Sequence, residues 1–122
     1  MPQTNTPIQN NVFPVTVSVV SNRSGQLSLM FNPDTVELSS ERNALITYTL
    51  TTAGYHFPTD GSALVISGDN NEFPIAWYVD ACNISLGDYN NNSASYKYTM
   101  TVVNSSDGST ITTDPTIKNN NE

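Results

Sequence analysis

Few residues in this chain of 122 are of the types that carry out catalysis. It contains one histidine, His56, and one cysteine, Cys82. A serine or cysteine nucleophile would need His56 as its general base, together with a third group that orients the imidazole ring. The Gly-x-Ser-x-Gly turn that presents a nucleophilic serine in many hydrolases does not occur in the sequence. We therefore expect no enzymatic activity, and a weak hydrolase using His56 or loop carboxylates is the second alternative.

The same two residues are too few for the common transition-metal centres. A blue-copper site uses two histidines and one cysteine, usually with a methionine, and this chain has a single histidine. A structural zinc site needs four cysteine or histidine ligands. We therefore predict no transition metal and no bound cofactor.

Oxygen ligands for a harder cation are more plentiful. Asp88, Asn90 and Asn92 alternate along one segment, as the ligands of a calcium loop do. Ser93 stands where the EF-hand loop needs glycine, and Thr99 stands where it needs glutamate. The sequence thus predicts, as one alternative function, a looser calcium site that uses Asp88, Asn90 and Asn92.

Aromatic residues provide a second candidate ligand surface. Tyr55, His56 and Phe57 lie together in a predicted loop over residues 52–61, and Phe73 lies in a later one. If the four gather at one end of the domain, they could form a surface for a sugar or a peptide. A sugar-binding module is therefore the other form of the first alternative.

Several acidic residues lie in or beside predicted loops. Paired carboxylates could hydrolyse glycosides at a separation of about 5 to 9 Å, which the sequence cannot establish for any pair. The acids concerned are Asp60, Asp69, Glu72, Asp80 and Asp88, and most of them are interpreted as turn formers.

The clearest hydrophobic patterns in the sequence repeat every two residues, as in β-strands. Strands must therefore position these side chains. Apolar residues alternate with mostly polar ones over 15–20, 46–50 and 96–102, which puts one side of each strand in a core. Trp77, between Ile75 and Val79, is predicted to anchor that core. Turns spaced about ten residues apart predict an all-β, immunoglobulin-like antiparallel β-sandwich of about seven to nine strands.

The domain is expected to span residues 12–118, with flexible polar termini at 1–11 and 119–122. The formal net charge of −7 repels phosphate backbones and anionic lipids. We therefore predict no nucleic-acid partner and no membrane partner. No secretory signal or apolar segment of about 20 residues is visible, and Cys82 has no partner for a disulfide, so we expect a cytoplasmic location.

The C-terminal quarter resembles known proteins. The strand at 96–102, the Asp107-Gly108 turn and the threonine-rich strand after it resemble the final hairpin of bacterial immunoglobulin-like sandwiches, without their inter-sheet cysteine pair. The segment Asp114-Pro115-Thr116-Ile117-Lys118-Asn119 resembles the closing motif of the DP-EP family, small bacterial proteins of unknown function. The resemblance implies a bacterial all-β protein and supplies no catalytic residues.

The leading functional hypothesis is a non-catalytic binding or assembly module that acts through edge strands or end loops. Pro14 in the first strand and the break at Asp114-Pro115 suggest sheet edges that could pair with another chain. The expected partner is another protein, or a second copy of this one, along an edge strand.

Overall fold

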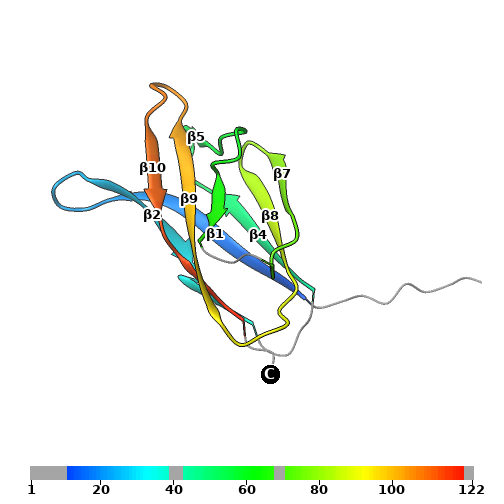
Figure 1. The fold of residues 1–122 in the computed structure, drawn as a ribbon. Coiled ribbons are helices and arrows are strands. Elements are labelled where there is room, and N and C mark those ends of the chain that lie inside the picture. Colours follow the sequence, from blue (N-terminus) through cyan, green and yellow to red (C-terminus); the bar gives the residue numbers. More distant parts are fainter. Residues whose placement is uncertain (1–10, 39–42, 68–70, 120–122) are drawn as a thin grey trace, which may run out of the picture.

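The computed structural model describes residues 11–38, 43–67 and 71–119, and this part of the chain contains strands but no helix. The strands form two packed sheets, so the predicted all-β sandwich is confirmed (Figure 1). In chain order they are β1 (Val12–Ser21), β2 (Leu27–Asn32), β3 (Thr35–Glu37), β4 (Ala44–Leu50), β5 (Tyr55–His56), β6 (Leu64–Ile66), β7 (Ala76–Asp80), β8 (Asn83–Asp88), β9 (Ser95–Asn104), β10 (Thr110–Thr113) and β11 (Thr116–Lys118).

The first sheet has the order β2-β1-β4-β8-β7, with β1 parallel to β4 and its other pairs antiparallel. The prediction that Pro14 marks an edge strand is therefore wrong, because β1 lies between two others. The proline is tolerated because β2 pairs only with Thr16–Ser21, while Pro14 lies opposite Thr47 of β4. At Pro14, the edge of β1 that faces away from β4 has no partner strand among the described residues, so the missing N–H of proline removes no hydrogen bond from this sheet.

The second sheet is built on the long strand β9. Along one edge of β9 lie β10 and then β11, separated by the predicted break at Asp114-Pro115, and β3 pairs in parallel with β11. Along its other edge lie β5 and β6. The two parallel pairs make both sheets mixed rather than purely antiparallel. The eleven strands of the described residues exceed the predicted seven to nine, because two further short strands form: β5, within a predicted loop, and β11, after the break at Asp114-Pro115.

The core lies between the sheets, where alternate residues of each strand point inward. Tyr48 of β4 and Tyr98 of β9 meet there edge to face, with 5.8 Å between ring centroids. Aliphatic side chains of both sheets surround this pair, as the period-two pattern predicts: Val15, Val17, Ile46, Leu86, Met100, Val102 and Ile117 are almost completely buried.

The two long sides of the sandwich differ. On one side β2 and β10 lie next to each other (Figure 1), and the N–H of Leu29 donates to Oγ1 of Thr113 at 3.1 Å. On the other side lie β7 and β6, and each pairs along one edge only with strands of the described chain. The sandwich is therefore closed at β2 and β10 and open at β6 and β7.

The predicted flexible termini fall largely outside the described residues. Asn11 and Asn119 are exceptions. The carbonyl of Asn11 accepts the N–H of Leu45 at 2.9 Å, and Asn119 is buried and donates its N–H to the carbonyl of Ala94 at 2.9 Å. The packed domain thus extends one residue further than predicted at each end. Within residues 11–38, 43–67 and 71–119 there is no apolar helix with the length needed to cross a membrane.

Candidate functional site

Four large apolar residues that lie close together in the chain are exposed at β7, one of the two outermost strands of the first sheet. We call residues Ile75–Val79 the β7 edge. All five side chains are exposed, with fractional exposures of 47% for Ile75, 46% for Trp77, 48% for Tyr78 and 60% for Val79. The prediction that Trp77 anchors the core is therefore wrong. Period two correctly grouped Ile75, Trp77 and Val79, but Trp77 lies opposite Ser85 of β8, so these residues are on the outer face of the sheet, away from the core.

The backbone of the β7 edge has hydrogen-bonding groups directed away from the sheet. Gly87 of β8 donates its N–H to the carbonyl of Ile75 at 2.9 Å. Because the C=O and N–H of a trans peptide unit point in opposite directions, the N–H of Ala76 faces the open edge. Trp77 lies opposite Ser85 and continues this alternation, so the N–H of Tyr78 faces the open edge too.

A groove separates β7 from β6 and the loop before it. We call it the β6–β7 groove, and two cavities form it. One, of about 170 Å³, extends from Pro58, Thr59 and Gly61 to Tyr78. The other, of about 360 Å³, extends from Ile66 to Phe73 and Pro74. Ala76 and Leu64 line both.

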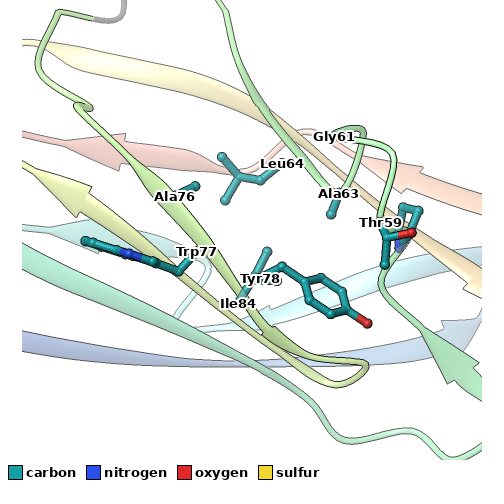
Figure 2. A pocket seen from close by; sticks show the side chains of 9 residues that line it. Thr59, Gly61, Ala63, Leu64, Ala76, Trp77, Tyr78 and Ile84 are labelled. Carbon is teal, nitrogen blue, oxygen red and sulfur yellow. The ribbon is translucent and has the colours of Figure 1, made fainter.

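The floor of the groove belongs to the core. Ile84 lines the smaller cavity and Leu86 the larger, and both are buried residues of β8. Figure 2 shows the indole of Trp77 and the ring of Tyr78 extending in opposite directions from β7. A chain lying along the β7 edge could therefore contact apolar side chains on both faces of the sheet.

The four residues of the predicted aromatic surface do not form one exposed surface. Phe57 is fully buried, and Phe73 is buried with its ring edge to face against Tyr96 at 5.0 Å. Tyr55 and His56 are half-buried and pair with β9 as the short strand β5. Phe73 nevertheless lines the larger cavity of the β6–β7 groove. Sugar binding stays a prediction.

The structure places a serine beside the single histidine. Nδ1 of His56 lies 2.7 Å from Oγ of Ser105 at an exposed position. Of the described carboxylates, none forms an ion pair with the His56 ring that could orient it as a triad requires. Asp60 and Asp80 act in turns, as predicted for the loop acids, and Asp69 lies outside the described residues. The hydrolase alternative stays a prediction.

The predicted calcium ligands lie in a polar cluster with two further residues. Asp88, Asn90 and Asn119 are buried, whereas Glu72 and Asn92 are half-buried. We call Glu72, Asp88, Asn90, Asn92 and Asn119 the Asp88 cluster. Nδ2 of Asn119 donates to Oε1 of Glu72 at 3.3 Å and to Oδ1 of Asn92 at 3.2 Å. Oδ1 of Asp88 accepts the N–H of Asn90 at 2.9 Å. Glu72 and Asn119 were not among the predicted ligands. They lie in different segments of the chain, 47 positions apart, and only the fold brings them together.

Two oxygen atoms of the Asp88 cluster are buried without a hydrogen-bond partner in the described structure: Oδ2 of Asp88 and Oδ1 of Asn119. The pKa of Asp88 is raised to about 6, chiefly by burial and to a smaller extent by the charge of Glu72. Hydrogen bonds from the N–H of Asn90 and the amide of Asn119 lower the pKa and offset part of this rise. Within the described residues no three side chains from His, Cys, Asp and Glu gather to hold a metal. Any cation here would therefore need amide oxygens as well as the two carboxylates.

Sequence reasoning missed the β7 edge, although a signal was present. Residues 75–79 are five consecutive apolar residues without the polar alternation of the other long strands. Such a run indicates a strand buried on both faces or one whose second face awaits a partner. No protein-family model and no curated protein matches the chain, so comparison with known proteins gives no information about its function.

Proposed function

We propose that this protein is a non-catalytic binding module that adds an extended segment of another polypeptide as a new strand along the β7 edge. The observation that carries the proposal is the combination of five exposed apolar side chains with backbone N–H groups directed to solvent. Unpaired strands of this kind are templates for strand addition, and soluble proteins usually protect them with charges, prolines or bulges.

Protection of the β7 edge is slight. No charged residue occurs between Ile75 and Val79, and the irregular pairing at Tyr78 and Asp80 affects only the end of the strand. In strand addition, main-chain hydrogen bonds supply affinity and pockets for alternate side chains supply specificity. The N–H groups of Ala76 and Tyr78 can form such main-chain hydrogen bonds, and the two cavities of the β6–β7 groove can accept alternate side chains.

Replacing Ala76 by proline is expected to abolish strand addition and leave the fold intact. Proline removes the N–H that faces the open edge and keeps every hydrogen bond between β7 and β8. The ring also obstructs an incoming strand. Peptides selected from a random nonapeptide library displayed on phage should therefore bind Ala76→Pro at least tenfold more weakly than the unchanged protein.

Ala76→Ser is the matched control, because serine keeps the N–H and nearly the size of alanine. It should bind the selected peptides like the unchanged protein, and near-ultraviolet circular dichroism should show the native fold in both variants. Equal binding by Ala76→Pro, or a selection that yields no binding peptide, contradicts the proposed function.

A second candidate function, calcium binding at the Asp88 cluster, is supported by the unpartnered oxygen atoms of Asp88 and Asn119. Calcium accepts six to eight oxygen ligands, including carboxylate and amide oxygens. Calorimetric titration with calcium chloride at pH 7.5 should then release or absorb heat, and Asp88→Asn should remove the signal. A flat titration of the unchanged protein rejects this candidate.

A further inference from the structure

The charges around the β6–β7 groove have one sign. Asp60 lies between Thr59 and Gly61, which line the smaller cavity, and Asp80 ends β7. These two acids lie at the same end of the groove, because Phe57 donates its N–H to the carbonyl of Ala81 at 2.8 Å. Glu72, one residue before Phe73, lies at the other end.

Both acids at the first end stay ionised to low pH. The hydroxyl and N–H of Ser62 hold the pKa of Asp60 below its ordinary value, and the side chain of Asn83 with the N–H of Cys82 does the same for Asp80. Each carboxylate keeps one oxygen for these turn contacts, so the other is available to an incoming cation.

None of the described cations lines either cavity of the groove. Arg23 is in the connection between β1 and β2, and Lys118 of β11 pairs with Glu37 at 3.8 Å. Lys97 lies opposite Ser67, just after β6, but on the outer face of the second sheet, because its neighbour Tyr98 points inward. Arg42 lies outside the described residues. A partner at the β6–β7 groove would thus meet an apolar surface with negative charges at its ends.

We propose that the segment added along the β7 edge is basic, with apolar side chains at alternate positions and Lys or Arg at both ends. This inference rests on the proposed function and names the class of partner. The apolar stretch should match the five residues of β7. Its inward side chains suit the smaller cavity, because an apolar cavity of about 150 Å³ can hold a benzene ring.

A second copy of this chain is the less suitable occupant. It carries the same net charge of −7, and its own β7 ends in an aspartate rather than a cation. Two such chains repel each other, whereas a segment with basic ends is attracted at each end of the groove.

Three labelled probe peptides test the inference. Each contains alternating valine and threonine over five residues, flanked by two lysines, two serines or two glutamates at each end. Fluorescence anisotropy in 50 mM salt should give the lysine probe at least tenfold higher affinity than the serine probe, and no binding of the glutamate probe. Raising the salt to 500 mM should remove most of the advantage, because exposed charges are then screened.

Two charge-matched double variants identify which acids matter. Asp60→Asn with Asp80→Asn should weaken binding of the lysine probe about fivefold and leave the serine probe unchanged. Asp34→Asn with Asp114→Asn removes the same two charges from the connections beside β2 and β10, on the closed side, and should change neither. If both double variants weaken the lysine probe equally, general acidity explains the preference and the inference fails.

The remaining outcomes separate this inference from the proposed function. Equal affinity for lysine and serine probes, both sensitive to Ala76→Pro, overturns the basic partner and leaves strand addition standing. A concentration-dependent dimer that Ala76→Pro abolishes replaces the basic partner with a second copy. Absence of any binding sensitive to Ala76→Pro, by the probes and by the selected peptides, overturns both.

Discussion

Replacing Tyr48 by alanine is expected to lower the free energy of unfolding by about 4 kcal/mol, as typical for a buried aromatic side chain cut back to alanine. Tyr48 is fully buried on β4, between β1 and β8 in the first sheet, and its ring lies edge to face against Tyr98 of the second sheet. The variant loses this contact between the sheets and leaves a cavity. Since domains are stable by only about 5–15 kcal/mol, this loss endangers the fold.

Tyr48→Phe removes the hydroxyl group and keeps the ring, so it distinguishes their contributions to the free energy of unfolding. The hydroxyl is buried and has no hydrogen-bond partner in the described structure, and burial raises the pKa of Tyr48 well above its ordinary value. Removing a buried polar atom without a partner should therefore leave stability unchanged or raise it by up to about 1 kcal/mol. Urea unfolding followed by circular dichroism measures both variants. A loss in Tyr48→Phe as large as in Tyr48→Ala would show that the hydroxyl, rather than the ring, stabilises the core.

The second large effect is a pH dependence produced by Asp88. Its pKa is about 6 in the folded protein, chiefly because of burial, and about 3.8 in an unfolded chain. Between these values the folded state holds the proton more tightly, so stability falls as the pH rises toward 6 and then stays lower. The pKa differs by about two units, and one unit corresponds to about 1.4 kcal/mol, so the loss from this residue is of the order of 3 kcal/mol.

Asp88→Asn isolates this contribution. Asparagine keeps an oxygen that can accept the N–H of Asn90 but has no charge to bury. In urea unfolding with a chelator present, the variant should match the unchanged protein near pH 3, below both pKa values, and exceed its stability near pH 8. Three other acids have lowered pKa values, so their contribution to stability rises with pH, and it does so only at lower pH: Asp60, Asp80 and Asp107. Parallel pH profiles for the two proteins would show that Asp88 does not titrate in this range.

The strands and much of the core were predictable, because alternation of side chains along a strand is a local property. Val15, Val17, Met100 and Val102 alternate with more exposed residues, and the structure buries all four. The turn at Asp107-Gly108 was predictable for the same reason, since Gly108 takes the positive φ of 78° that glycine adopts readily.

The candidate sites were less predictable, because they depend on which strands are neighbours. Trp77 has the same period-two setting as core residues, yet its side of β7 is the outer face of the sheet. Phe57 and Phe73 were assigned to an exposed surface and lie in the core. For the Asp88 cluster, the sequence indicated Asp88, Asn90 and Asn92 but could not bring Glu72 and Asn119 to them.

The sequence by itself determined that this is an all-β protein with inward-facing aliphatic and tyrosine residues, because the two-residue repeat of a strand is set by the backbone. The single histidine and single cysteine led to the expectation of a non-catalytic protein, which stays a prediction. Only the tertiary structure decided that Ile75–Val79 is an uncovered edge beside a groove and that Asp88, Asn90 and Asn119 of the Asp88 cluster are buried. Alternation shows which side chains share a face of a strand. What covers that face depends on strand order, which arises from contacts between distant segments.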